Sequence, residues 1–470
     1  MAGALFLVYT AVSLRIHHRM LSNSYDLGIF EQVVRSYADG HLPVSELKGP
    51  GFPVLGDHFS PVLALVAPFY LLHRSATTLL VVQAALIALS VVPLALWARR
   101  ALGSVAGALI GACYGLSWGI ASAVGFDFHE VAFAAPLLAF SLAALGSNRP
   151  TAAACWAMPL LLVKEDLGLT VGVIGLVIAW RGTRRLGFVT AAAGVAGTLL
   201  ALLAVLPAFN PNGSFAYWFL ADSPTGTSGA GSGPLDLLYR STVGLVTPQT
   251  KLSTLALVLA PTVFLALRSP LLWVAVPTLV WRLFSNNYVH WGTGYHYSLV
   301  VMPIVFAAFV DALVRRGTEH GSLRRYLAAS AAVTLAILPS FPFWQLFSPA
   351  TWRSDPRVAV AHSLMKKIPD DATVQASTYL VPQLTNRTSV SLYGYPVSRP
   401  SPQWIMVDTW VAARWRWPLT FEAERAMLNQ ARAQGYRTVD DRDGFVLLHL
   451  THRPERTPVS GDLDASKHKG

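Results

Sequence analysis

Long apolar runs separated by short polar segments dominate residues 1–348. Two of these runs, 76–97 and 186–206, contain no charged residue. A helix needs about 20 apolar residues to cross the roughly 30 Å hydrocarbon core of a bilayer. Because backbone groups in lipid must pair within their own segment, such runs are helices. The pattern predicts an all-α polytopic membrane domain with about eleven spans.

The predicted spans share length and apolar character, although some are shorter than others. They are 2–14, 76–97, 105–124, 131–146, 152–163, 167–180, 186–206, 253–267, 270–284, 296–314 and 326–347. The first run resembles a signal peptide, but Arg15 and not a small-residue cleavage site follows it, so we expect a retained helix. The run 60–72 suits an interfacial or re-entrant segment better than a span.

Composition supports a membrane protein. Hydrophobic residues make up 53% of the chain and charged residues only 13%, and the mean hydropathy is +0.45. A soluble domain carries about a quarter charged residues. The net charge of +11 is the one feature that suggests nucleic acid, but the placement of the arginines explains it better. Cys113 and Cys155 both lie inside apolar runs and indicate neither a disulfide framework nor a thiolate metal site.

The arginines predict the orientation. If the N-terminus is cytoplasmic and the spans alternate, five short cytoplasmic loops hold most of the positive charge near the membrane, as the positive-inside rule requires. Those arginines are Arg99, Arg100, Arg149, Arg181, Arg184, Arg185, Arg268, Arg315, Arg316, Arg324 and Arg325. We therefore expect a multi-pass protein of the plasma membrane with an exoplasmic C-terminal domain.

The same orientation collects the acidic residues and histidines next to the spans on the outer side. They lie in 25–32 (YDLGIFEQ), 56–61 (GDHFSP), 126–130 (FDFHE), 164–166 (KED), 207–252 and 286–296 (NNYVHWGTGYH). Ionisable residues close to lipid are costly, so they are candidates for function.

Segment 23–39 follows the first span and repeats apolar residues at helical spacing. It predicts an amphipathic helix on the outer surface. Asp26 lies at its start, where a carboxylate either caps the helix or serves a functional site. The spacing leaves both interpretations open.

The motif FDFHE combines Asp127, His129 and Glu130. These residue types bind a divalent cation or act as general acid and base. The alternative is an ordinary polar turn.

The motif KED places Lys164, Glu165 and Asp166 between two short apolar segments. Lys164 is suited to binding a phosphate, with a neighbouring carboxylate as its partner. An exposed turn is the alternative.

Segment 286–297 contains His290 and His296 among aromatic residues, and His58 lies in a comparable polar stretch. Aromatic residues form belts at the membrane interface, and their rings also stack on sugars. Both interpretations stay open, and the three histidines are candidates for substrate binding.

The chain becomes polar after about residue 350. Helices are expected at 358–368 and 420–434, and strands at 374–377, 389–394, 404–408 and within 435–450. This alternation predicts a small exoplasmic α/β domain over 349–452 after a transmembrane domain over 1–348, which includes juxtamembrane helices at 24–39 and 60–72. The polar tail 453–470 is predicted to be disordered. The Gly/Ser-rich loop 221–234 is predicted to be a flexible linker, with a mobile lid as the alternative.

These motifs, in this order, resemble those of a bacterial membrane protein family, domain of unknown function 2079 (DUF2079). The matching segments are YDLGIFEQ, HFSP, FDFHE, KEDLGL and VPQLTNRTSVSLYGYP, and the resemblance covers about residues 20–450. The layout is also similar to that of the C-type (GT-C) glycosyltransferases, polytopic enzymes that use polyprenyl-phosphate sugars.

The GT-C resemblance implies roles for individual residues. Asp26 matches an acidic residue on the juxtamembrane helix of the first outer loop. Asp127 with His129 matches a second acidic site after the third span, and Lys164 matches a lysine between the fifth and sixth spans. The chain lacks the Asp-x-Asp of better-known members in its first loop. Metal dependence is therefore open, with a divalent cation as the cofactor to test.

The leading hypothesis is inverting glycosyl transfer on the outer face, from a polyprenyl-phosphate sugar to a cell-envelope acceptor. Asp26 would be the base, Asp127 and His129 would orient the acceptor or a cation, and Lys164 would neutralise the departing phosphate. A transporter or flippase is the second hypothesis, because transporters bind substrates at broken helices near the midplane. A non-catalytic protein of envelope assembly is the third.

Overall fold

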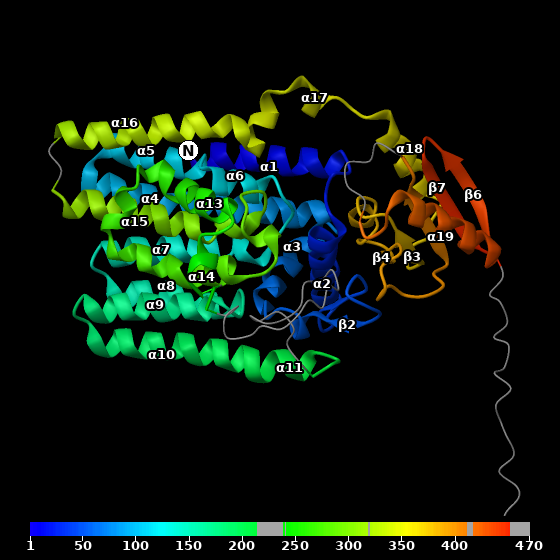
Figure 1. Cartoon of the computed structure of the whole chain (residues 1–470), viewed down its shortest axis with the longest axis horizontal. Coiled ribbons are helices and arrows are strands. Elements are labelled where there is room, and N and C mark those ends of the chain that lie inside the picture. The colour runs from blue at the N-terminus through cyan, green and yellow to red at the C-terminus, as the bar shows by residue number, and fades with distance from the viewer. Residues whose placement is uncertain (214–237, 240, 318–319, 411–416, 452–470) are drawn as a thin grey trace, which may run out of the picture.

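The computed structural model describes the whole chain apart from residues 214–237, 240, 318–319, 411–416 and 452–470. The predicted linker 221–234 and the predicted tail 453–470 lie outside the described residues. The chain is mostly helical, at 67%, and a small sheet lies toward its C-terminus. Figure 1 shows the helices side by side in one bundle and the strands gathered beyond one of its ends.

The bundle is built from apolar helices. They are α1 (Ala2–His18), α4 (Ala76–Leu102), α5 (Ser104–Gly115), α6 (Trp118–Val124), α7 (Ala134–Gly146), α8 (Pro150–Ala157), α9 (Leu167–Trp180), α10 (Arg184–Leu200), α13 (Gln249–Leu259), α14 (Val276–Phe284), α15 (Val301–Arg315) and α16 (His320–Ile337). One continuous apolar core joins them.

Small residues allow two of these helices to pack unusually closely. A Cβ atom added at Gly194 of α10 would lie 2.4 Å from the backbone oxygen of Gly168 in α9, and one added at Gly168 would lie 2.5 Å from the oxygen of Gly194. Without a hydrophobic driving force in lipid, helices associate through such backbone contacts. The glycines in the apolar runs therefore serve helix packing.

Three described helices, Ala76–Leu102, Arg184–Phe209 and His296–Arg315, are long and apolar enough to cross a membrane. Ser104–Gly115 and Trp118–Val124, bent by 46°, make a fourth if they form one span. Several other predicted spans contain shorter regular helices, because 3-10 turns interrupt them at prolines such as Pro159. The predicted number of about eleven spans stays a prediction.

The predicted span 253–267 is not one helix. Helix α13 ends at Leu259, and Val263 and Phe264 then adopt left-handed backbone conformations with φ of 50° and 59°. Such angles are rare for β-branched and bulky residues and stop a helix. The apolar pattern located the buried segment correctly but not its break.

Two juxtamembrane elements lie at the end of the bundle nearest the sheet. A π-helical turn, η1 (Ser24–Gly28), leads into α2 (Ile29–Ala38). Figure 1 shows α2 running across the ends of the bundle helices. The run 60–72 forms the short helices η3 (Pro61–Val66) and α3 (Ala67–Leu72). Their apolar side chains pack against those of α2.

The C-terminal sheet has five strands in the order β4-β3-β5-β7-β6. They are β3 (Thr373–Ala376), β4 (Ser389–Leu392), β5 (Trp404–Asp408), β6 (Tyr436–Arg442) and β7 (Phe445–Leu450). Strands β4, β3 and β5 are parallel, and β7 runs antiparallel to β5 and β6. The sequence-based strands and helices of this region are confirmed.

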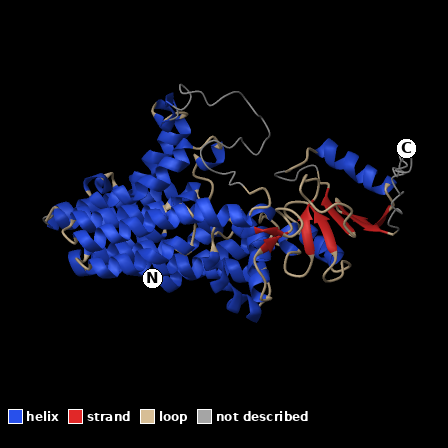
Figure 2. Cartoon of the chain, turned by 90° about the horizontal axis from the view of Figure 1, so that it is seen from below, coloured by secondary structure: helices blue, strands red, loops and turns tan. Residues whose placement is uncertain are grey.

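Helices cover both faces of this sheet. Helix α18 (Pro356–Met365) packs in one core, and α19 (Phe421–Ala433) packs in the other. The first core also takes in Met20, Ile29 and Leu47 from the beginning of the chain. Figure 2 shows the strands directly beside the helical bundle. The segment that follows α1 therefore contributes residues to the sheet domain's own core.

Candidate functional site

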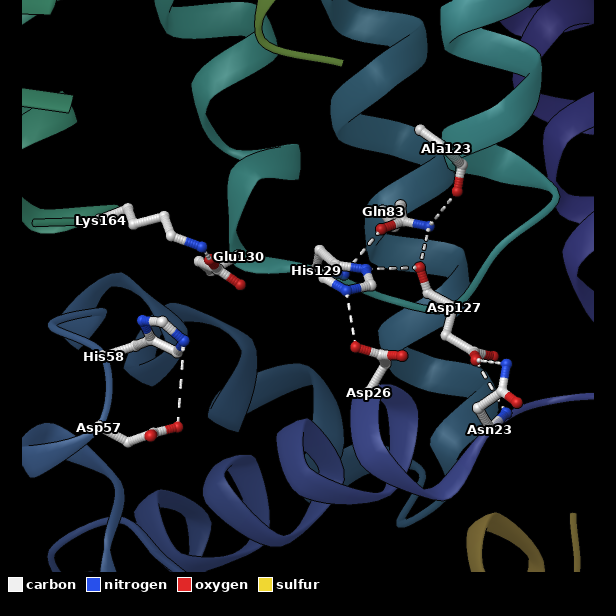
Figure 3. A network of polar contacts seen from close by, with 10 residues as sticks. All are labelled: Asn23, Asp26, Asp57, His58, Gln83, Ala123, Asp127, His129, Glu130 and Lys164. Carbon is white, nitrogen blue, oxygen red and sulfur yellow. Dashed lines mark hydrogen bonds and ion pairs between the residues drawn. The ribbon is translucent and has the colours of Figure 1, made fainter. Parts of the chain in front are cut away.

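Asp26 and His129 form an ion pair where the bundle meets the sheet domain. The Nε2 atom of His129 lies 3.0 Å from Oδ1 of Asp26 (Figure 3). The side chain of Asp26 is 29% exposed, whereas that of His129 is only 4% exposed. Asp26 comes from the π-helical turn η1, a rare element that is often found at functional sites. The buried His129 thus holds the Asp26 carboxylate in place, while part of the Asp26 side chain remains exposed.

Gln83 of α4 holds the FDFHE turn in place. Its Nε2 donates to the backbone oxygen of Asp127 at 3.2 Å, and its Oε1 accepts from the backbone N–H of His129 at 3.0 Å. Gln83 is a buried polar residue inside a candidate span. A polar residue inside an apolar run is the sequence feature that could have identified Gln83, because none of the motifs contains it.

The carboxylate of Asp127 points to Asn23 and not to His129. Its Oδ2 accepts hydrogen bonds from the backbone N–H of Asn23 at 2.8 Å and from Asn23 Nδ2 at 3.0 Å. Burial, and secondly the charge of Asp26, raise the pKa of Asp127 to about 7. In this arrangement Asp127 fixes the chain segment that enters the Asp26 turn.

The hydrogen bonds of His129 define the proton content of the pair. Nδ1 lies 3.1 Å from the backbone oxygen of Asp127, which only accepts, so Nδ1 carries a hydrogen. At Nε2, the contact is an ion pair when the imidazole is protonated and donates to the Asp26 carboxylate.

His296 stacks on His129. The ring centroids are 3.4 Å apart and the ring planes differ by 23°. Phe126 stacks on both imidazoles, and Tyr295 meets Phe126 edge-on at 4.9 Å. Within the described residues, Nδ1 of His296 is buried with no hydrogen-bond partner. The aromatic segment 286–297 thus contacts the Asp26–His129 pair through His296.

His290 lies farther along the same loop. Its Nδ1 is 2.7 Å from the hydroxyl of Ser285, and its ring meets Trp281 and Tyr297 edge-on. Burial, followed by the positive charges of Lys164 and Arg282, lowers the pKa of His290 to about 4. This histidine is therefore neutral at physiological pH and supports the loop.

Arg282 organises this loop, although the sequence motifs did not indicate it. The guanidinium donates to the backbone oxygens of His290 and Gly292, and at 2.9 Å to the hydroxyl of Ser298. Arg282 is 1% exposed. A lone arginine within an apolar run was the signal that identifies it as a functional candidate.

Lys164 and Glu130 form a second ion pair in the same region, with Lys164 Nζ 2.8 Å from Glu130 Oε1 (Figure 3). Burial alone lowers the pKa of Lys164, but the carboxylates around it, first that of Glu130, outweigh burial and raise that pKa. Glu130 directly follows His129 in the chain, and Figure 3 shows the two pairs near one another. Lys164 stays positively charged there.

Glu165 and His58 form a third pair. His58 Nδ1 lies 2.9 Å from Glu165 Oε1, and the backbone N–H of Phe59 donates to Oε2 at 3.1 Å. Burial alone would raise the pKa of Glu165, but His58 outweighs it and lowers that pKa. The pair fastens the 56–61 segment to the KED turn, so His58 and Glu165 support the neighbouring Lys164.

Asp166 faces a different space. It borders an apolar cavity of about 810 Å³ between α9, α10 and α14. Asp166 Oδ1 and Trp281 Nε1 line this cavity and are buried with no hydrogen-bond partner in the described part of the chain. Burial raises the pKa of Asp166 to about 6. The KED turn thus connects the ion pairs to an open apolar groove formed by α9, α10 and α14.

Among the residues that the structure describes, no group of three or more His, Cys, Asp or Glu side chains is placed to hold a metal ion. Asp127 is turned toward Asn23, and Glu130 is turned toward Lys164. The structure therefore assigns no ligand set to the divalent cation that the motifs suggested.

A family model described as "Predicted membrane protein (DUF2079)" matches residues 16–447. The chain belongs to this family, which confirms the resemblance found in its motifs. No curated protein matches the sequence.

Two solved structures share the fold, and both are crystal structures of ArnT from Cupriavidus metallidurans. The apo structure has a TM-score of 0.51 at 13% identity and covers 95% of this chain and 98% of that chain. The structure bound to undecaprenyl phosphate has a TM-score of 0.53 at 14% identity and covers 95% and 97%. At this identity the similarity shows the fold alone.

Proposed function

We propose that this DUF2079 membrane protein is an inverting glycosyltransferase. It transfers a sugar from a polyprenyl-phosphate donor to a cell-envelope acceptor on the outer face of the plasma membrane. The observation that carries the proposal is the accessible Asp26 carboxylate, held by buried His129 at the end of a GT-C-like bundle.

Asp26 is the base of this reaction. An acceptor hydroxyl donates to Asp26 and loses its proton as its oxygen attacks the anomeric carbon of the donor. The bond from that carbon to the phosphate oxygen breaks, and the lipid phosphate leaves with the electron pair. His129 stabilises the Asp26 carboxylate through the 3.0 Å contact at Nε2. A positioned base of this kind contributes about 10²–10⁴-fold to the rate.

Lys164 is suited to the leaving phosphate. An ammonium group has three N–H donors, and the pair with Glu130 uses one of them. The other two are available to phosphate oxygens. Negative charge grows on the phosphate as the glycosidic bond breaks, and a fixed positive charge beside it lowers the barrier. Glu130 holds Lys164 in place for this role.

The apolar cavity beside Asp166 suits the polyprenyl chain. Its walls are the apolar faces of α9, α10 and α14, and Asp166 at its border directly follows Glu165 and Lys164. One of the two structurally similar ArnT crystals contains undecaprenyl phosphate. A lipid seated in the cavity has its phosphate near the KED turn, and the partly exposed rings of Tyr295 and Tyr297 offer faces to the sugar.

The proposal includes the orientation derived from the arginines. The N-terminus is cytoplasmic, the KED and FDFHE turns face outward, and the sheet domain is exoplasmic. Acceptors of the cell envelope then reach Asp26 directly from the aqueous side.

Envelope glycan analysis tests the proposal in cells that lack the native gene. The cells express wild type, Asp26→Asn or Asp39→Asn at matched protein levels. Asp39 ends the same helix and pairs with the exposed Arg74. We expect Asp26→Asn to lose a glycan modification that wild type and Asp39→Asn restore. A restored modification in Asp26→Asn cells would contradict the proposal.

Lipid translocation is the second candidate, and the cavity beside Asp166 within the helices is the observation that favours it. A flippase moves lipid without a base. Flipping of a labelled polyprenyl phosphate by Asp26→Asn protein in vesicles, without any glycan transfer by wild type, would select this function.

A further inference from the structure

The helical segment that carries Asp26 is buried on two opposite faces. Its apolar face, with Leu27, Phe30, Val33 and Val34, packs on the juxtamembrane helices and the bundle. Its other face points toward the sheet domain, and Ser24, Gly28, Gln32 and Arg35 lie on it at spacings of three and four residues. Asp26 lies between Ser24 and Gln32.

Gln32 uses its whole amide group to join three segments. Its Nε2 donates at 2.8 Å to the backbone oxygen of Val390 in β4, and its Oε1 accepts from the Ser45 hydroxyl at 2.7 Å. The backbone N–H of Leu47 approaches the same Oε1 at 3.4 Å. Gln32 is 7% exposed. Burying an amide is favourable only when it is hydrogen-bonded, so these contacts fix the helix against the sheet.

Ser24 makes the second anchor. Its hydroxyl lies 2.8 Å from the hydroxyl of Thr378, directly after β3. Ser24 is fully buried. Between the anchors, Gly28 allows close approach, since a Cβ atom there would lie 2.8 Å from Leu47 Cδ1 and 3.2 Å from Val381 Cγ1. The sheet domain therefore holds the segment on both sides of Asp26.

Two further contacts extend this interface. Thr385 donates a hydrogen bond to Glu31, and Arg35 donates to the backbone oxygens of Thr385 and Thr388 at 3.2 and 3.1 Å. The rotation of the helix about its axis is thus set by the sheet domain, and this rotation aims Asp26.

We propose that the sheet domain positions the catalytic base. Gln32 and Ser24 are its positioning residues, and they act through the η1–α2 segment to keep the Asp26 carboxylate against His129. The proposal rests on the proposed function for its kinetic consequence, but its structural consequence is independent of any activity. A misplacement of about 1 Å at a reacting group can cost about 100-fold in rate.

The test compares Gln32→Met with Asp371→Asn in the full-length protein. Methionine keeps the volume of Gln32 and removes its three hydrogen bonds. Asp371 contacts the same helix through Arg35 at 3.3 Å but is 85% exposed, so its loss matters little. Hydrogen exchange of residues 24–31 and steady-state transfer kinetics are measured for both variants.

For Gln32→Met, we expect exchange in 24–31 to accelerate at least about 10-fold, and kcat to fall by about 10- to 100-fold with the donor KM unchanged. Asp371→Asn is expected to match wild type in both measurements. Unchanged exchange in Gln32→Met, or accelerated exchange with wild-type kcat, would overturn the positioning role. If even wild type shows no transfer, accelerated exchange in Gln32→Met would still support the positioning of Asp26. The absence of transfer would then reject only the proposed function.

A crosslink tests whether the sheet domain stays in place during turnover. The double substitution Ser24→Cys and Thr378→Cys puts two thiols where hydroxyls lie 2.8 Å apart, and the reduced protein is its own control. The reduced form lacks the Ser24–Thr378 hydrogen bond, whereas the disulfide restores this link, so fixed positioning predicts a kcat in the oxidised form at least as high as in the reduced form. Loss of turnover on oxidation, regained on reduction, would show that the domain must separate and would contradict the proposal.

Discussion

The Nε2 atom of His129 lies 3.0 Å from the carboxylate of Asp26, although the two residues are 103 positions apart in the chain. Asp26 belongs to the segment that follows α1, and His129 belongs to the loop after the third predicted span. Both are held by polar partners: buried Gln83 holds the His129 turn, and partly buried Asn23 with buried Asp127 holds the Asp26 turn. This contact is the centre of the proposed site.

Replacement of His129 by phenylalanine tests the ring's role at Asp26. The aromatic contact with His296 remains, but the hydrogen bond to Asp26 is lost. We expect transfer to slow by about 100-fold or more, within the range for a general acid–base group. Purified protein with melting behaviour like wild type and an undiminished transfer rate would show that His129 only packs.

Substitution of Asp127 separates positioning from chemistry. Asparagine still accepts a hydrogen bond from Asn23, so Asp127→Asn should keep transfer activity. Alanine removes the acceptor of the partly buried N–H of Asn23, which costs about 1 kcal/mol of unfolding free energy. Thermal unfolding and transfer rates of both variants check this. An inactive but stably folded Asp127→Asn would instead give the carboxylate a chemical role.

Asp127 also predicts a pH dependence of stability. Its pKa is raised from the ordinary 3.8 to about 7 in the folded protein, so folding favours the protonated form. Its contribution to stability is therefore fully present below pH 3.8 and is lost as pH rises through 7. We expect the decline in melting temperature between pH 4 and 7 to be shallower in Asp127→Asn. An identical slope in both proteins would contradict the prediction.

We expect the Lys164–Glu130 pair to strengthen the binding of undecaprenyl phosphate. Removing Lys164 alone would leave Glu130 buried and unpaired, so the test is the neutral double variant Lys164→Met with Glu130→Gln. Charge-assisted hydrogen bonds contribute about 1.5–3 kcal/mol, so we expect undecaprenyl phosphate to bind about 10- to 100-fold more weakly. Titration of detergent-purified protein with this lipid measures the change. Equal affinity would remove Lys164 from the phosphate site.

The close contact between Gly168 of α9 and Gly194 of α10 predicts that alanine substitutions at two glycines differ in their effect on stability. A methyl group at Gly194 would lie 2.4 Å from the backbone oxygen of Gly168, whereas one at Gly172 meets no atom closer than 3.7 Å. Gly194→Ala should destabilise the protein by about 1–3 kcal/mol, and Gly172→Ala should leave it unchanged or slightly stabilised. Melting temperatures in detergent give the comparison. Equal melting temperatures of Gly194→Ala and Gly172→Ala would contradict the prediction that the close helix contact leaves no room for a methyl group at Gly194.

The sequence was sufficient to predict the class of fold and most of the sheet domain. The segments predicted as strands are β3, β4 and β5 of the structure. Burial alternates along β3, whereas β5 is buried on both faces. Apolar runs report burial or lipid contact but not backbone angles. They therefore missed the left-handed residues Val263 and Phe264 that end one predicted helix.

The site was predicted only in outline. The outer-side clustering of Asp26, His129, Lys164 and His296 was inferred from charge and orientation, and the structure brings these residues together. Their pairings depend on contacts between segments far apart in the chain, which no local pattern encodes. Asp127 consequently faces Asn23, and Gln83 and Arg282, which lie inside apolar runs, proved to hold the loops.

The most direct test of the proposed function follows the lipid product. Purified wild type, Asp26→Asn and Asp39→Asn are incubated with polyprenyl-phosphate sugars extracted from the native cells, together with envelope acceptor. Released polyprenyl phosphate is quantified, and binding of undecaprenyl phosphate is measured in parallel. We predict acceptor-dependent release by wild type and Asp39→Asn, and a loss of at least about 100-fold in Asp26→Asn with lipid binding intact. Release by Asp26→Asn at the wild-type rate would contradict the role of Asp26 as the base.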